Sequence, residues 1–418
     1  MSLWIRDLQL PWPTARIRDC ASIINGWPLD STRFNDSVGM PVVRIRDLLR
    51  GWTDTYYDGN DFPASTVVRD GDLVIGMDGD FNSSTWRGLA GVLNQRLCIL
   101  RSKPLVDPRF LAYFINIPLR AIHATTFSTT VKHLSSQDLG HERMPIPPLP
   151  DQQRISDFLD DETSRIDELW RAKRRMLDLL SERRMSVLLQ HLSGLTGMVP
   201  PVPTRQLAWL RQRPGHWREA KLSLIGKLGS GHTPSRSRPE WWEDADIPWI
   251  TTGEVTLIRD DRTEQIRSTR ERISKAGLAN SSALVHPAGT VVLSRTASAG
   301  FSAIMGLDMA TSQDFATWTC GPLLRPRFLL LCLRAMRADL LGRLAMGSTH
   351  KTIYMPDIES LRVPLPPVEE QDLIVENVWY CIRPLDEAWD SLVAQIDLLR
   401  ERRHALITAA VTGELEVA

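Results

Sequence analysis

A long internal repeat constrains the fold of this chain more than any other feature of its sequence. The segment that ends at Gly194 aligns with the segment that ends at Gly413 at a constant offset of 219 residues, without a gap. Self-similarity at one fixed period indicates a duplicated structural unit. We therefore expect two copies of one unit, related by a pseudo-two-fold axis. The matched pairs include Thr130 with Thr349, Lys132 with Lys351, Asp138 with Asp357, Arg143 with Arg362, Gln152 with Gln371, and Trp170 with Trp389.

Each copy contains a proline-rich segment followed by a long stretch of helical periodicity. Prolines lack a backbone donor, so 144–148 and 363–367 should end the element before them. Apolar residues then recur at the three- and four-residue steps that are typical of a coiled-coil seam. We expect Pro384 to kink the second helix or to separate its first turns. The predicted seam residues are Ile155, Leu159, Ile166, Leu169, Met176, Leu180 and Val187 in the first copy, and Ile374, Val378, Leu385, Ala388, Leu399 and Leu406 in the second.

The stretch before each helix has about the size of a single domain. Short apolar runs between glycines and prolines predict that both stretches are β-rich. Tight turns at Gly71 and Gly289 should precede core strands, and Pro108 and Pro326 should open short helices. The predicted fold class is therefore α+β, with two β-rich globular domains separated by two long antiparallel coiled-coil helices in a pseudo-two-fold tandem repeat. The expected boundaries are 1–147 and 216–366 for the globular domains, 148–196 and 367–418 for the long helices, and 197–215 for a proline-rich linker.

The overall charge of the chain is zero, with 50 basic and 50 acidic residues. A nucleic-acid-binding protein with this balance must concentrate its positive charge locally. Seven of the basic residues are lysines, which leaves 43 arginines, and the planar guanidinium suits bidentate contacts to guanine and phosphate. The sequence reaches a charged residue at Arg6, and it has no apolar run typical of a signal peptide or a membrane span. We therefore expect a cytoplasmic protein.

The sequence has no recognisable catalytic motif. None of its three Pro-Pro pairs has the Asn/Asp-Pro-Pro-aromatic form of an amino-methyltransferase, and HExxH and GxSxG do not occur. The glycine-rich segment 226–233 lacks the Gly-Lys-Ser/Thr ending of a phosphate-binding loop. Glu219 and Lys221 have the spacing of a nuclease Glu-x-Lys pair, but no Pro-Asp precedes them at a suitable distance, so we expect the solvated edge of a strand.

The cysteines form no metal-binding pattern. There is no CxxC pair and no nearby histidine cluster of the kind that binds zinc. Isolated cysteines in a protein of this type are usually buried free thiols. We expect this of all five, which are Cys20, Cys98, Cys320, Cys332 and Cys381.

Three segments carry a specific family resemblance. The boxes 145–155 (PIPPLPDQQRI) and 364–374 (PLPPVEEQDLI), with the closing segment 398–415, resemble the conserved regions of the specificity subunit of type I restriction-modification systems. The resemblance covers essentially the whole chain. It implies that 1–147 and 216–366 are target-recognition domains, each of which reads one half of an asymmetric bipartite DNA site.

The two domains resemble different openings known in that family. Ser230-Gly-His-Thr-Pro followed by Ile247-Pro-Trp-Ile is similar to a common opening of a target-recognition domain. The first domain departs from it, with Ile23-Ile-Asn-Gly-Trp-Pro and Pro41-Val-Val-Arg-Ile-Arg-Asp, another pattern seen in the family. Unlike domains should read unlike half-sites, so the target should be asymmetric.

The resemblance also implies partners and cofactors. The subunit should have no chemistry and no cofactor of its own. It should bind double-stranded DNA and assemble with two adenine-N6 methyltransferase subunits, which carry S-adenosylmethionine and dock on the helices. Restriction/translocase subunits, which use ATP and Mg²⁺, should join this phage-defence complex. The repeat alone also permits a coiled-coil scaffold whose two globular ends bind proteins.

Candidate site residues follow from these expectations. Lys132 and Lys351, beside Thr130 and Thr349, recur in both halves, as expected of phosphate anchors; the alternative is a lysine that only supports its loop. Base-reading residues should differ between the halves. The candidates are Arg44, Arg46, Asn94, Gln95 and Arg96 in the first domain, and Thr233, Arg236, Arg238, Arg295 and Gln313 in the second.

A further group of recurring residues on the helices could form a partner-docking face. The alternative for the two tryptophans is packing at the rim of the coiled coil. Trp241 and Trp242 could stack on a distorted base, although core packing is the more usual role of such residues. The docking candidates are Trp170, Arg183, Arg184, Trp389, Arg402 and Arg403.

Overall fold

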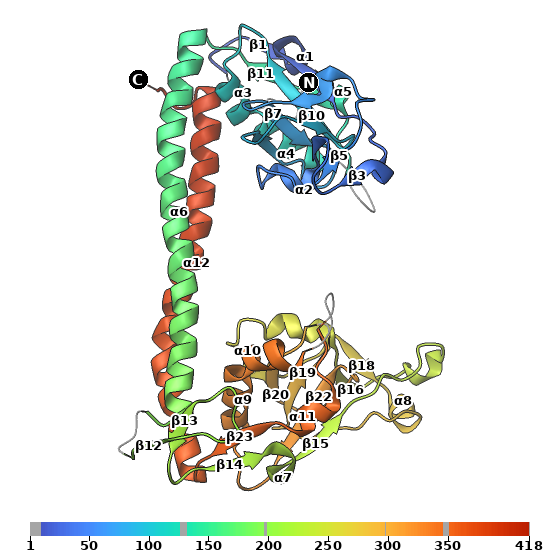
Figure 1. Ribbon diagram of the computed structural model, residues 1–418, viewed down its shortest axis with the longest axis vertical. Coiled ribbons are helices and arrows are strands. Elements are labelled where there is room, and N and C mark those ends of the chain that lie inside the picture. Colours follow the sequence, from blue (N-terminus) through green and yellow to red (C-terminus); the bar gives the residue numbers. More distant parts are fainter. Residues whose placement is uncertain (1–9, 126–131, 196–198, 297, 346–350, 418) are drawn as a thin grey trace. The chain divides into compact units, whose positions relative to one another are not determined.

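The computed structural model describes residues 10–125, 132–195, 199–296, 298–345 and 351–417. Two long helices, α6 (Leu149–Leu192) and α12 (Val368–Thr412), account for much of the chain (Figure 1). The chain divides into two compact units, and each long helix contributes one half to each unit. The first unit comprises Met1–Lys173 with Ala394–Ala418, and the second comprises Arg174–Val393.

The first unit contains a mixed α/β domain with two main sheets. One is antiparallel, in the order β2-β10-β7-β8, and the other has the order β3-β5-β4-β9-β6 with a parallel β4–β9 pair. A small β1–β11 pair closes the domain beside α6. The strands are β1 (Thr14–Arg16), β2 (Ala21–Asn25), β3 (Phe34–Asn35), β4 (Met40–Val43), β5 (Tyr56–Tyr57), β6 (Val67–Val68), β7 (Leu73–Gly76), β8 (Ser83–Thr85), β9 (Gly91–Leu93), β10 (Leu97–Ser102) and β11 (Arg143–Pro145), and the helices are α1 (Ile17–Cys20), α2 (Ile45–Leu48), α3 (Pro108–Phe114), α4 (Asn116–Thr125) and α5 (Ser136–His141).

The second unit repeats this topology. Its main sheet has the order β15-β22-β19-β20-β17, and a three-stranded sheet β18-β16-β21 contains a parallel β16–β21 pair equivalent to β4–β9. The β14–β23 pair corresponds to β1–β11. The strands are β14 (Arg218–Lys221), β15 (Gly226–Ser230), β16 (Ile247–Ile250), β17 (Gln265–Ile266), β18 (Glu271–Ile273), β19 (Val291–Ser294), β20 (Ser302–Met305), β21 (Ala310–Thr311), β22 (Phe315–Cys320) and β23 (Arg362–Leu365), and the helices are α7 (Leu222–Ile225), α8 (Lys275–Ala279), α9 (Pro326–Ala335), α10 (Arg337–Asp339) and α11 (Met355–Glu359).

The local elements predicted from the sequence are confirmed. Gly71 and Gly289 have φ angles of +88° and +86°, which glycine adopts without steric cost, and each precedes a fully buried strand, β7 or β19. Pro108 and Pro326 stand in the first turns of α3 and α9. The duplication therefore extends through the globular domains, where few residues are identical.

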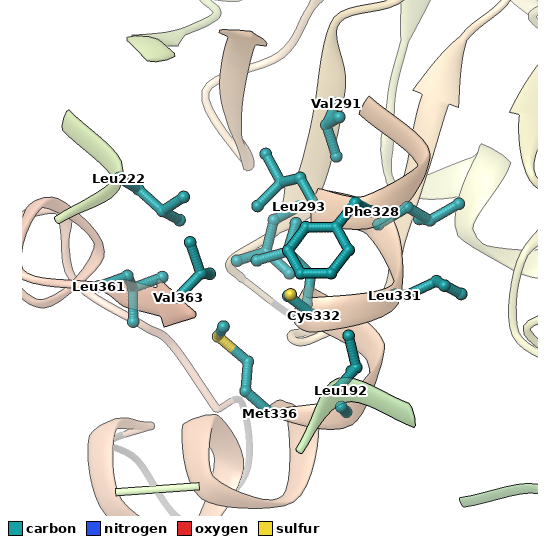
Figure 2. Close-up of a cluster of buried hydrophobic side chains, with 14 of the residues drawn as sticks. Leu192, Leu222, Val291, Leu293, Phe328, Leu331, Cys332, Met336, Leu361 and Val363 are labelled. Carbon is teal, nitrogen blue, oxygen red and sulfur yellow. The ribbon is translucent and has the colours of Figure 1, made fainter. Parts of the chain in front are cut away.

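The core of the second unit joins the domain to the helix pair. Figure 2 shows Phe328 and Cys332 of α9 close to Leu293 of β19, with Leu192 of α6 and Val363 of β23 in the same group. Each of these side chains is fully buried. Burial of apolar surface at about 25 cal/mol per Å² thus fixes this end of α6 to the domain as well as to α12.

A buried glutamine holds each domain on the first turn of its long helix. Gln152 Oε1 accepts a hydrogen bond from the Asp107 backbone N–H at 2.9 Å, and its Nε2 donates to the carbonyls of Leu105 and Pro147. Gln371 makes the same three bonds. Its Oε1 accepts from the backbone N–H of Arg325, and its Nε2 donates to the carbonyls at positions 323 and 366. Both side chains are completely buried, and each amide satisfies backbone groups that are buried or partly buried.

Within each unit α6 and α12 pack in antiparallel directions. In the first unit Ile155 and Leu159 share a core cluster with Ala410 and Val411, and in the second Leu188 and Leu192 share one with Val375 and Val378. Ion pairs follow the same repeat: Arg403 Nε lies 3.2 Å from Asp167 Oδ1, and Arg184 Nη1 lies 3.4 Å from Asp386 Oδ1. These two pairs are related by the 219-residue offset, as the predicted pseudo-two-fold axis requires.

The predicted seam is wrong in part of each helix. Leu169 and Met176 are half exposed, whereas Trp170 and Leu177 face the partner helix. In α12 Ala388 is exposed, and the seam contains Trp389. The buried seam also contains Thr163 and, on α12, Ile382, Leu392 and Ile396. Counting apolar residues gave the wrong seam positions because polar and aromatic residues occupy several of the true ones. Aliphatic residues one position away have the same heptad spacing and were taken for the seam.

Four further expectations need correction. Pro384 lies inside α12, which continues through it as one helix, so the first turns are not separated. The segment expected as a linker contains a hairpin, β12 (Pro201–Pro203) with β13 (Gln212–Pro214). The Glu219 carboxylate is only 8% exposed and pairs with Arg213, so it is not solvated. The thiol of Cys381 is exposed and that of Cys320 is partly exposed, while the other three cysteines are buried as predicted.

We predict that Gln152→Ala lowers the free energy of unfolding by about 2–4 kcal/mol, because three buried backbone groups lose their partners. Urea titration followed by circular dichroism measures this loss. Gln153→Ala is the matched control: the side chain of Gln153 is exposed on the same turn, so its removal should change stability by no more than about 0.5 kcal/mol. Equal effects of the two substitutions would contradict the role assigned to the buried amide.

The corrected seam generates a second prediction. Leu177→Ala should destabilise the protein by about 2–4 kcal/mol, because the Leu177 side chain is 3% exposed and its loss leaves a cavity. Met176→Ala removes an apolar side chain that is 51% exposed one residue away, and it should cost less than about 1 kcal/mol. Thermal unfolding of both variants distinguishes the two heptad phases. A larger loss of stability in the Met176 variant would contradict the corrected seam and support the seam positions expected from the sequence.

Candidate nucleic-acid interface

In the second domain, polar side chains collect where β15 and β19 end and β22 begins. Thr233 Oγ1 donates a hydrogen bond to Gln313 Oε1 at 2.6 Å, and Arg295 Nε donates to the Gln313 carbonyl at 2.9 Å. Asp314 accepts hydrogen bonds from the hydroxyls of Thr296 and Ser312. We call the group 232–233, 295–296 and 312–314 the second recognition edge. The structure thus brings together three of the five candidates predicted for this domain.

The first domain has an equivalent group at the ends of β2 and β7 and the start of β10. Asn94, Gln95 and Arg96 form the turn between β9 and β10. Asp78, two residues after β7, accepts a hydrogen bond from His133 Nδ1 at 2.6 Å and lies 3.4 Å from Arg96 Nε. We call the group 77–78, 94–96 and 132–133 the first recognition edge.

The two recognition edges share one backbone framework. Met77 N–H donates to the carbonyl of Arg96, and Arg295 N–H donates to the carbonyl of Asp314, at positions 218 residues apart. The carbonyls of Met77 and Arg295 in turn accept bonds from the N–H groups at positions 134 and 353. Gln95 and Gln313 therefore occupy the same place in the two domains. The side chains around them differ, because Asp78 and Arg96 stand where the second domain has Thr296 and Asp314.

The two matched lysines lie next to these edges and contact backbone carbonyls. Lys132 Nζ donates to the carbonyl of His123 at 2.5 Å, and Lys351 Nζ donates to the carbonyl of Leu341 at 3.2 Å. The Lys132 ammonium group therefore sits beside the last turn of α4, and that of Lys351 beside the π-helix η6 (Leu340–Leu344). Lys132 is partly buried and Lys351 is exposed. Thr130 and Thr349 lie outside the described residues.

The other candidates are not members of the two recognition edges and make local contacts of their own, although Arg44 follows Val43, whose carbonyl accepts a hydrogen bond from Asn94 N–H. Arg44 pairs with Asp47 and Asp54, both at 2.8 Å, in a cap of α2, and it is only 16% exposed; Arg46 on the same helix is exposed. Arg236 pairs with Glu271 and lies 3.7 Å from the ring centroid of Trp242, while exposed Arg238 lies 3.7 Å from a Glu240 oxygen. The indoles of Trp242 and Trp249 pack edge to face, so Trp242 is part of the local packing. The side chain of Trp241 is partly buried.

The predicted docking residues separate into two groups. Trp170 and Trp389 occupy seam positions, and Arg184 and Arg403 pair with Asp386 and Asp167 across the helices. The Arg183 and Arg402 side chains are exposed and point away from this seam group. Sequence reasoning did not identify Asp78, His133 or Asp314, because a single carboxylate or imidazole after a strand carries no motif.

Metal-binding and membrane-spanning features were not found in the described residues. They contain no group of three or more His, Cys, Asp or Glu side chains able to hold a metal ion. Among the helices that the structure describes, none combines the length and apolarity needed to cross a bilayer.

The fold and these edges define a tandem-repeat protein with two related β-rich domains on paired helices. The model of the type I restriction modification DNA specificity domain matches residues 10–174 and 214–383. The chain is 28% identical over 422 residues to the type I restriction enzyme EcoBI specificity subunit of Escherichia coli, covering 97% of this chain and 86% of that protein. It is also 28% identical over 171 residues to the MjaIX specificity subunit of Methanocaldococcus jannaschii, covering 40% of this chain and 38% of that protein.

A solved structure shows the same fold. It aligns with this chain with a TM-score of 0.64 and 21% identity, covering 98% of this chain and 100% of that one. That structure is described as "Structural basis underlying complex assembly and conformational transition of the type I R-M system". The family model matches well over half of the residues in two copies. This chain therefore belongs to the specificity subunits of type I restriction-modification systems, as the resemblance in its sequence indicated.

Proposed function

We propose that this chain is the non-catalytic DNA-recognition subunit of a type I restriction-modification complex and that it reads an asymmetric bipartite target. One observation carries the proposal: the recognition edges share their backbone hydrogen bonds but differ in the side chains that they present. A shared framework places both edges against DNA in the same way, and unlike side chains select unlike base pairs.

Gln95 and Gln313 are the central base-reading candidates in this proposal. A glutamine amide can donate and accept at once, and it pairs with the major-groove edge of adenine. The Thr233 hydroxyl donates a hydrogen bond to Gln313 Oε1. In the proposal this leaves the amide N–H groups of Gln313 to donate to an acceptor on the base. Arg295 beside Gln313, and Arg96 beside Gln95, add the guanidinium groups that suit guanine or phosphate. Asn94 contributes a second amide to the first edge.

Phosphate contacts fix the register of the duplex in the proposal. Lys132 and Lys351 occupy matched positions in the sequence, each two residues after a threonine, Thr130 or Thr349, and they supply charge without sequence information. Their hydrogen bonds to carbonyls at 123 and 341 hold each ammonium group in place before DNA arrives. This local placement reconciles DNA binding with zero net charge.

The helix pair has two roles in the proposal. It sets the spacing of the half-sites, because α6 and α12 each run through both units and span about 65 Å at 1.5 Å per residue. It also docks two adenine methyltransferase subunits, for which Arg183 and Arg402 remain exposed at matched positions. S-adenosylmethionine, ATP and Mg²⁺ then belong to the methyltransferase and restriction/translocase subunits of a cytoplasmic complex.

Exchange of the first domain tests the proposal. Residues 1–143 would be replaced by the same region of a relative with a different target, and the hybrid would be expressed with the methyltransferase subunit. We expect the sites of N6-methyladenine, mapped by genome sequencing, to change in one half-site and to keep the other half-site and the gap. The reciprocal exchange of 216–362 is the matched control. A change in both half-sites after either exchange would contradict independent reading by the two domains.

A further inference from the structure

One further position belongs to both recognition edges, and the two domains have different residues there. The backbone N–H of Trp27 donates to the carbonyl of Leu93 at 2.8 Å, and that of His232 donates to the carbonyl of Thr311 at 3.0 Å. Leu93 and Thr311 are separated by 218 residues, the offset that relates the other bonds of the shared framework. Trp27 and His232 therefore occupy equivalent places, each two residues after a strand, β2 or β15.

A glycine directly before each of these residues allows the backbone to approach the edge closely. A Cβ at Gly26 would overlap the backbone carbonyl oxygen of Asn94, and a Cβ at Gly231 would overlap that of Thr311. Rotation of a side chain cannot relieve an overlap with backbone, so glycine is the residue that fits at both places. The two domains thus share the glycine and differ in the residue that follows it.

Both residues adjoin groups that are assigned to base reading. Trp27 forms a parallel β-bridge with Asn94 of the first recognition edge. His232 directly precedes Thr233, whose hydroxyl donates to Gln313 Oε1 at 2.6 Å in the second recognition edge. A duplex that contacts these amides therefore also comes close to the residue at 27 or 232.

The two side chains offer different chemistry to a duplex. Trp27 is 39% exposed, so part of its large indole meets solvent in the free protein. The only apolar group on the base edges of the major groove is the C5-methyl of thymine. The imidazole of exposed His232 offers ring nitrogens instead, which donate or accept hydrogen bonds.

We propose that Trp27 is a specificity-determining residue of the first domain and packs against the C5-methyl group of a thymine, whereas His232 at the same place hydrogen-bonds to a base of the second half-site. This inference rests on the proposed function, because it requires both recognition edges to face the major groove. Burial of the indole against the methyl group favours the complex, and a base pair without that methyl loses the contact. The half-site of the first domain therefore contains an A·T pair that faces Trp27.

Mapping of methylated sites separates this inference from the proposed function. Each variant is expressed with the methyltransferase subunit, and N6-methyladenine is mapped by genome sequencing. We expect Trp27→His to alter or relax one base pair of the first half-site only, and His232→Trp to do the same in the second half-site only. Trp52→His is the matched control: Trp52 is 56% exposed in the same domain but is not a member of either edge, so the mapped sites should not change.

The outcomes of this mapping are distinct. A wild-type chain that gives no bipartite motif would contradict the proposed function itself. A bipartite motif in the wild type that the Trp27 and His232 variants both retain would overturn the inference and leave the proposed function intact.

Replacement of thymine by deoxyuridine, which lacks only the C5-methyl group, tests the proposed contact. The complex of the full chain with its methyltransferase subunit binds duplexes of the mapped target in which each thymine of the first half-site is replaced in turn. At one position we expect the wild-type affinity to fall about fourfold, as for the loss of one buried methyl group. The same replacement should leave the affinity of the Trp27→Ala variant unchanged, and the Trp52→Ala variant should behave as the wild type does. An unchanged wild-type affinity at every position, or equal losses in the wild type and the Trp27 variant, would overturn the thymine contact.

Discussion

A buried glutamine amide in each repeat connects the globular domain to its long helix, and the rest of the structure depends on this connection. Gln152 and Gln371 each bridge the segment before a short helix, the proline box and the first helical turn through three hydrogen bonds. Because both amides are buried, no water replaces a lost bond. Each domain is therefore held on its helix by the same local geometry, whatever residues its loops contain.

This arrangement separates what must stay constant from what can vary. The proline boxes, the glutamines and the cross-helix pairs Asp167–Arg403 and Asp386–Arg184 recur at one offset. The recognition edges keep only their backbone bonds, while Asp78 and Arg96 in one domain are replaced by Thr296 and Asp314 in the other. Loops on a rigid scaffold tolerate such changes, and this explains how one fold can present two different sets of side chains.

The repeat alone was enough to predict the two-domain α+β architecture, the paired helices and the short helices at Pro108 and Pro326. The heptad phase was not predictable by counting apolar residues, since Trp170 and Thr163 occupy seam positions beside the misleading Leu169. Arg44 is predicted as a base reader only because it is an arginine. Asp47, three residues later, could have indicated the helix cap in which the Arg44 side chain is engaged. Asp78 could not be identified as a site residue from the sequence, because its partner His133 comes from a distant segment.

We propose that the two helices set the spacing of the half-sites, and a matched change in helix length tests this most directly. Removing seven residues from each helix, 171–177 and 390–396, preserves the heptad phase and shortens both by about 10 Å. At 3.4 Å per base pair, the gap between the methylated half-sites should shrink by about three base pairs, and a seven-residue insertion in each helix should lengthen it equally. Half-sites and gap that remain unchanged in both variants would contradict the account.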